Sequence, residues 1–214
     1  MQGVLEVVDD VPQAFARLVA AARMDSIALS GGDTARRCYE LLATAEVSWQ
    51  HTTVFFGDER WVPIHDPDSN EGMARVTFLD QVQPAAVHSM RAAGKTPAGA
   101  ATAYDEILRT ASGIDLVHLG LGDDGHAASL FPGSPALDEA NALVVATGDE
   151  LHPHNRVTLT FPAIARARLV VFTVSGAAKR DAFERVQRGD DVPASRVRAP
   201  HIMWLVDRAA TGEA

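Results

Sequence analysis

Ser26-Ile27-Ala28-Leu29-Ser30-Gly31-Gly32-Asp33-Thr34 joins a short apolar run, through two glycines, to a segment of helical character. An uninterrupted apolar run of this length is typical of a strand that is covered on both faces. A strand that turns directly into a helix is the repeating unit of α/β folds. We therefore expect Ser26–Ser30 to be a strand of a parallel sheet and Thr34–Ala43 to be the helix that follows it.

The same alternation continues along the chain. The other expected strands are Thr53–Phe56, Asp115–Leu121, Leu143–Ala146, Arg156–Phe161, Leu169–Val174 and Ile202–Val206. The other expected helices are Val11–Arg23, Asn70–Asp80, Ala98–Thr110 and Ala177–Arg188, the last ended by Gly189. Alternation of this kind implies right-handed crossovers. The predicted class is α/β, with a mostly parallel sheet and helices on both faces, in a single domain over residues 1–214.

Composition narrows the class of protein. The chain has 214 residues, of which 47% are hydrophobic and 22% charged, which is ordinary for a globular domain and unlike a disordered chain. A net charge of −9 argues against nucleic acid or an acidic membrane as the main partner. The single Cys38 excludes a disulfide framework and a cysteine zinc cluster. The start of the chain, residues 1–10, has no basic region and the apolar runs are short, so we expect a soluble cytoplasmic protein, a monomer or a small homo-oligomer.

The diglycine turn, residues 30–34, is the first candidate binding element. Gly31 and Gly32 allow the backbone to approach a ligand, the following helix start supplies unpaired N–H groups, and Thr34 adds a hydroxyl. This geometry suits a phosphate. It matches neither the Walker A loop nor the dinucleotide fingerprint. The alternative is a tight turn that Thr34 merely caps.

Three charged residues, 58–60, follow the end of the expected strand at residues 53–56. Asp58 and Arg60 follow Gly57, at a position where parallel sheets place their ligands. Arg60 is suited to a forked pair with phosphate or carboxylate. The alternative is a solvated turn with a local ion pair. Downstream, residues 66–70 read Asp-Pro-Asp-Ser-Asn, which predicts a turn and a helix N-cap.

Residues 119–132, LGLGDDGHAASLFP, are the most informative segment. Gly125 is expected to adopt an unusual backbone angle that aims His126, and Asp124 stands two residues away to orient the ring. An imidazole so placed is a candidate general acid or base; the alternative is a packed or surface histidine. Zinc and iron sites recruit more His or Cys at defined spacing, so we expect no metal. The other histidines show no ligand spacing: His51, His65, His88, His118, His152, His154 and His201.

Two cations complete the candidate site. Arg156 begins an expected strand after the polar connection 148–155, which we expect to border a pocket. Lys179 lies near the start of an expected helix, where a cation is unfavourable unless an anion compensates it. The alternatives are a surface arginine and a solvated lysine.

Taken together and in this order, the motifs SGGxT, FFGDERWV, DPDSN, LGLGDDGHAASLFP, RVTLTF and SGAAK closely resemble those of the 6-phosphogluconolactonase family, from about residue 26 to residue 207. The resemblance implies the Rossmann-like three-layer fold shared with glucosamine-6-phosphate deaminase. It also implies hydrolysis of 6-phospho-D-glucono-1,5-lactone in the oxidative pentose phosphate pathway, without metal or organic cofactor. The sequence departs from the family at Asp33, where a neutral or basic residue is more usual, and at Ala35, where proline is.

Roles follow from the resemblance residue by residue. Gly31, Gly32 and Thr34 would hold the phosphate. Arg60, Arg156 and Lys179 would neutralise the phosphate or polarise the lactone, with Asp58 in the same binding set. His126 would take a proton from the attacking water and return it to the departing ring oxygen, and Asp124 would orient the site.

Two alternatives share the expected fold. Sugar-phosphate deaminases and isomerases resemble DGHIAFNEP, with an acid shortly after the histidine, whereas here the next acid is Asp138. A non-catalytic sugar-phosphate sensor would carry a DNA-binding segment, and none fits before residue 26. The lactonase is therefore favoured.

Overall fold

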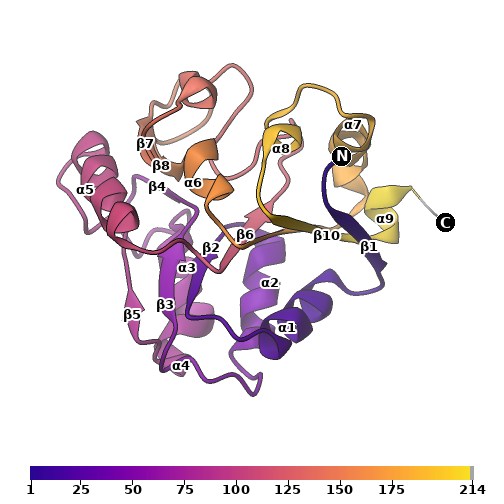
Figure 1. Ribbon diagram of the computed structural model, residues 1–214, viewed down its shortest axis with the longest axis horizontal. Helices are drawn as coiled ribbons and strands as arrows, with labels where there is room; N and C mark the ends of the chain where they lie inside the picture. The colour runs from indigo at the N-terminus through magenta and orange to yellow at the C-terminus, as the bar shows by residue number, and fades with distance from the viewer. Residues whose placement is uncertain (213–214) are drawn as a thin grey trace.

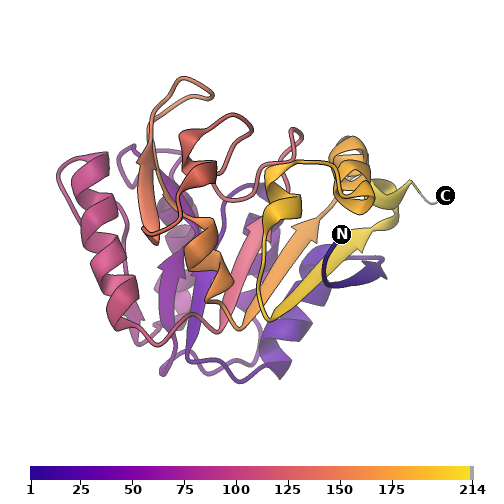
Figure 2. The same cartoon turned by 45° about the horizontal axis from the view of Figure 1, so that its top comes forward.

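A parallel sheet forms the centre of the protein in a computed structural model that describes residues 1–212 (Figure 1). Its strands run in the order β1-β10-β9-β6-β2-β3-β5. They are β1 Val4–Val8, β2 Ser26–Leu29, β3 Thr53–Phe56, β5 Ala86–Val87, β6 Leu116–Gly120, β9 Leu169–Val174 and β10 His201–Asp207. Figure 2 shows the arrows of β9 and β10, orange and yellow, pointing the same way. The predicted α/β class and parallel sheet are confirmed.

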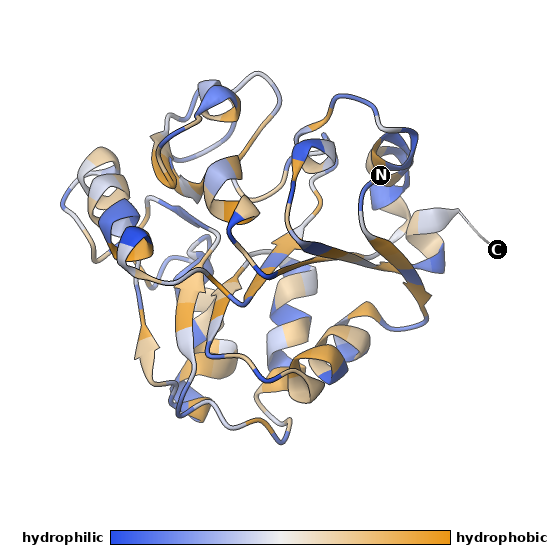
Figure 3. Ribbon diagram, viewed as in Figure 1, coloured by the Kyte–Doolittle hydropathy of each residue, from blue (hydrophilic) through white to orange (hydrophobic). Residues whose placement is uncertain are grey.

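The central strands are covered on both faces, as their apolar runs predict. Ile27, Ala28 and Leu29 of β2 have no exposed surface, and the strands of the sheet are coloured mostly as hydrophobic in Figure 3. Burial of continuous apolar runs is the main favourable term that holds such a sheet between its helices. Strand β1 was not predicted, because at the sheet edge Val4 and Val7 stay exposed and the run is interrupted by Glu6.

The helices surround this sheet. Helices α1 and α2 pack on each other, α1 over β9 and β10, and α2 over β9. The bounds are α1 Val11–Ala21, α2 Asp33–Leu42, α3 Asn70–Ala74, η1 Arg75–Leu79, α4 Asp80–Val82, α5 Pro97–Thr110, η2 Pro135–Asp138, α6 Phe161–Ala165, η3 Ala177–Lys179, α7 Arg180–Arg188, α8 Pro193–Arg196 and α9 Arg208–Thr211. The expected helix at 70–80 is present, with a wider π turn, η1, at its centre. Gly189 ends α7 in the left-handed conformation, with φ of +78°, as predicted. Among residues 1–212, no helix combines the length and the apolar character needed to cross a bilayer.

A small antiparallel sheet, in the order β4-β8-β7, stands apart from the main one. Its strands are β4 Asp58–Arg60, β7 Val144–Thr147 and β8 Arg156–Leu159. The strands expected at 143–146 and 156–161 are therefore present but do not join the parallel sheet, and Phe161 begins α6 instead. Gly57 links the two sheets: its N–H donates to Leu29 of β2 at 2.8 Å, and its carbonyl accepts from Leu159 of β8 at 2.8 Å. The small sheet thus lies beside the carboxyl end of β3, and it positions Asp58, Arg60 and Arg156 at that edge of the main sheet.

Candidate active site

A crevice of about 250 Å³ opens at the carboxyl ends of the parallel strands. It is where α/β sheets place their ligands. Its lining residues are Ser30, Gly31, Gly32, Asp58, Arg60, Asn70, Gly120, Leu121, Gly122, Asp123, His126, Ala128, Arg156 and Lys179. All but two of the predicted site residues therefore line one crevice. The exceptions are Thr34 and Asp124.

The diglycine turn separates this crevice from a second hollow of about 290 Å³. Gly31, Gly32 and Lys179 line both, whereas Thr34 lines only the second. Gly32 is the N-cap of α2, with φ of +92° and no side-chain capping bond, so Thr34 does not cap this helix and its first N–H groups remain available to an anion. The Asp33 carboxylate also lines the second hollow, but it pairs with Arg36 at 2.7 Å.

His126 is held by Asp124. The Asp124 Oδ1 atom lies 2.6 Å from Nδ1 of the ring and 3.0 Å from the His126 backbone nitrogen. Burial alone would raise the pKa of the Asp124 carboxyl, but the hydrogen bonds from His126 outweigh it and hold that pKa below its usual value. Asp124 is thus an anion that accepts a hydrogen bond from Nδ1–H, which leaves Nε2 as the ring nitrogen with a free lone pair.

Two glycines shape the turn that carries His126. A Cβ on Gly122 would stand 2.0 Å from His126 Nδ1, so the ring occupies the space that a side chain would take. Gly125 has φ of +89°, as predicted, and a Cβ there would meet Val192 at 2.7 Å. Phe131 packs on the imidazole, with ring centroids 4.2 Å apart. Gly122 and Phe131 therefore restrict the positions that the ring can take.

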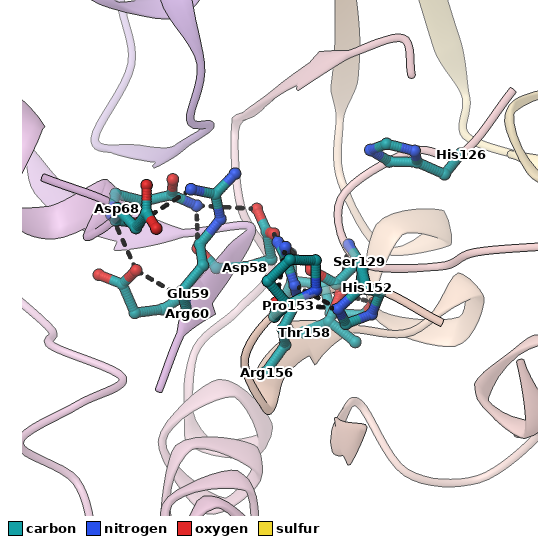
Figure 4. A network of polar contacts seen from close by, with 12 residues as sticks. Asp58, Glu59, Arg60, Asp68, His126, Ser129, His152, Pro153, Arg156 and Thr158 are labelled. Carbon is teal, nitrogen blue, oxygen red and sulfur yellow. Dashed lines mark hydrogen bonds and ion pairs between the residues drawn. The ribbon is translucent and has the colours of Figure 1, made fainter. Parts of the chain in front are cut away.

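Arg60 and Arg156 are direct partners across the β4–β8 ladder (Figure 4). Directly opposed side chains share a face of the sheet, and like charges placed so are destabilising. The Arg60 Nη1 group donates to the Asp68 carbonyl at 2.8 Å, and its buried Nε has no hydrogen-bond partner. The carboxylate that pairs with Arg156, that of Asp58, lies 3.9 Å away. Two cations that are so weakly neutralised indicate a site for an anion.

The Asp58 carboxylate is buried and engaged. It accepts from Ser129 Oγ at 2.5 Å and from Asn70 Nδ2 at 3.2 Å. Asn70 was predicted only as part of a helix cap, and Ser69 is the residue that caps the helix. The Asn70 side chain instead lines the crevice, and its Oδ1 would stand 1.8 Å from a Cβ on Gly31. Because the capping pattern already accounted for Asn70, this second role was not predicted. Glu59 faces away from the crevice and accepts hydrogen bonds from the start of α3.

Lys179 lies in η3, one residue before α7 begins. Its Nζ pairs with Asp123 at 2.6 Å, and both side chains line the crevice, so the cation is present but is partly neutralised by an exposed carboxylate. Asp123 carried no predicted role.

Comparisons with known proteins place the chain among sugar-phosphate enzymes. Residues 3–205 match the family described as glucosamine-6-phosphate isomerases/6-phosphogluconolactonase. A 6-phosphogluconolactonase of Synechocystis sp. is 40% identical over 209 residues, covering 91% of this chain and 86% of that protein. The crystal structure of 6-phosphogluconolactonase from Thermotoga maritima has a TM-score of 0.84 at 26% identity, over 96% of this chain and 100% of the other. A monomeric glucosamine-6-phosphate deaminase shares the fold, with a TM-score of 0.82 at 19% identity, over 99% of each chain.

Proposed function

The chain belongs to the glucosamine-6-phosphate isomerase/6-phosphogluconolactonase family, and we infer that it is a 6-phosphogluconolactonase, which hydrolyses 6-phospho-D-glucono-1,5-lactone to 6-phosphogluconate in the pentose phosphate pathway. The observation that carries the inference is the single crevice that joins His126 to the diglycine turn and three cations. Such a crevice offers a base for the reacting end of the substrate and an anion site for its phosphate.

His126 acts as the general base in this proposal. Its Nε2 takes a proton from water while the water oxygen bonds to the lactone carbonyl carbon, and negative charge develops on the carbonyl oxygen. Cations fixed in the crevice stabilise that charge. The bond from this carbon to the ring oxygen then breaks, and the imidazolium returns the proton to the departing oxygen, which yields the open hydroxy acid. Asp124 is a positioning residue that stabilises the imidazolium.

The phosphate is bound where the diglycine turn and Lys179 border both hollows. The residues at the start of α2 and Lys179 line the second hollow, while Arg60 and Arg156, on the small sheet, line the crevice on the other side of the diglycine turn. Phosphate binding orients the reacting carbon toward His126, so binding energy from a remote group serves the chemical step.

The deaminase alternative lacks the acid expected shortly after the histidine, because the next carboxylate, Asp138, is 90% exposed and does not line the crevice. Two other carboxylates line the crevice, but Asp58 accepts hydrogen bonds from Ser129 and Asn70, and Asp123 is paired with Lys179.

The test is to incubate the protein with freshly prepared 6-phosphogluconolactone and, separately, with glucosamine 6-phosphate. We expect accelerated acid release from the lactone and no ammonia from the amino sugar; ammonia release without lactone hydrolysis would assign the deaminase instead. Tight sugar-phosphate binding without either reaction would assign the sensor.

A further inference from the structure

The Arg156 guanidinium is held by the two residues His152 and Pro153 (Figure 4). Its Nε lies 3.0 Å from His152 Nδ1, and its Nη2 lies 3.3 Å from the Pro153 carbonyl oxygen. The third nitrogen, Nη1, lies 3.9 Å from the Asp58 carboxylate, beyond hydrogen-bonding distance. Two of the three nitrogens are therefore oriented by uncharged acceptors, and Nη1 is left for a ligand in the crevice.

The contact fixes the protonation state of His152. A guanidinium has only N–H donors, so Nδ1 must carry a lone pair, and the proton of the neutral ring is on Nε2. The same Nδ1 lies 3.2 Å from the Pro153 carbonyl oxygen, but that oxygen accepts a hydrogen bond from Arg156 Nη2 instead. Burial lowers the pKa of the His152 imidazole, and the positive charge of Arg156 acts in the same direction. The ring is a neutral acceptor near pH 7.

Packing holds His152 in place without bringing it into the crevice. Its ring lies against Phe131, with centroids 4.0 Å apart, and Phe131 contacts the His126 ring at 4.2 Å. His152 lines a separate cavity, of about 390 Å³, and not the crevice that His126 lines. Any effect of His152 on a ligand in the crevice must therefore pass through Arg156 or through Phe131.

We propose that His152 is a positioning residue for anion binding, which orients the Arg156 guanidinium through an uncharged acceptor and so adds no negative charge that would compete with the substrate phosphate. The proposal rests on the function inferred above. Lys179 provides the contrast, since its partner Asp123 at 2.6 Å is a carboxylate that partly neutralises it. An acidic residue at position 152 would orient Arg156 equally well but would compete with the substrate for its charge.

Three variants separate these contributions. His152→Phe keeps an aromatic ring against Phe131 and removes the acceptor. His152→Asn keeps an uncharged acceptor. His152→Asp introduces a side chain of nearly the same shape as asparagine but with a negative charge. His65→Asn is the matched control, because His65 is an exposed histidine outside the site. We expect KM to rise about tenfold in His152→Phe and in His152→Asp, to stay within threefold in His152→Asn, and to be unchanged in the control, with kcat within twofold throughout.

The variants are also compared by calorimetric binding of 6-phosphogluconate and of inorganic phosphate, and in an Arg156→Ala background. If His152 acts through Arg156, the loss caused by His152→Phe falls to within twofold once Arg156 is absent. An equal loss in both backgrounds, or a His152→Asp variant that binds as tightly as His152→Asn, would overturn the proposal. Failure of the parent to hydrolyse the lactone would instead refute the proposed function, and the phosphate titrations would still decide the role of His152.

Discussion

His118 is a buried histidine that the proposed reaction does not use. Its ring lies between the Tyr39 hydroxyl, 2.9 Å from Nδ1, and the Thr173 hydroxyl, 2.8 Å from Nε2, and it stacks on Phe15 at 4.1 Å. Burial lowers the pKa of this imidazole from 6.5 to about 3. The unfolded chain therefore binds a proton below pH 6.5 that the folded protein takes up only near pH 3.

This difference predicts a loss of stability in acid. The contribution of His118 is fully present above pH 6.5 and is lost as the pH falls toward 3. At about 1.4 kcal/mol per pKa unit, the whole shift corresponds to about 5 kcal/mol, of which about 3 kcal/mol is lost by pH 4.5. Asp124 and Asp105, whose pKa values are lowered in the folded protein, add their own loss in the same direction, so a variant is needed to isolate His118.

The assay is urea unfolding between pH 7.5 and 4.5 for the parent and His118→Leu. The variant is less stable at pH 7.5, because Tyr39 and Thr173 lose a partner, but its stability depends less on pH. We expect the gap between the two proteins to shrink by about 3 kcal/mol over this range. Parallel dependences of stability on pH for parent and variant would show that His118 is not held neutral in the fold.

Two further predictions concern the crevice. Gly122→Ala places a Cβ 2.0 Å from His126 Nδ1, so the ring must move, and kcat is expected to fall about a hundredfold while 6-phosphogluconate binding stays within threefold; unchanged kcat would show that the ring position is not critical. Lys179→Ala is expected to raise KM about tenfold, whereas Asp123→Asn, which removes the carboxylate partner, is expected to lower KM about twofold. Steady-state kinetics checks both, and equal KM values in the parent and Lys179→Ala would exclude this lysine as an anion ligand.

The main sheet was predictable because its signals are local. The runs at 53–56 and 169–174 are strands with the predicted bounds, since a strand buried on both faces must be apolar throughout. A strand at 156–161 was predicted, but its place in a second, antiparallel sheet was not, for a reason that no local pattern shows. Pairing of β8 with β4 depends on Gly57 turning the chain out of β3, about a hundred residues earlier.

Residues of the crevice were predictable where unusual residues stand at the ends of strands. His126, Arg60 and Lys179 were singled out because they follow strands, and Arg156 because it begins one after a polar connection. The fold brings all four to one crevice. Asn70 and His152 were missed for two different reasons. The capping pattern at 66–70 explained Asn70 completely, and His152 has no spacing signal, because its partner is defined by the conformation of the connection before β8.

The turnover of His126→Ala, measured beside its affinity for 6-phosphogluconate, tests most directly whether His126 is the general base. Loss of a general base costs about 10²- to 10⁴-fold in rate, while an alanine in the crevice leaves the diglycine turn and the cations in place. We expect a fall in kcat of that size with product binding within threefold of the parent. A kcat within tenfold of the parent would exclude His126 as the general base.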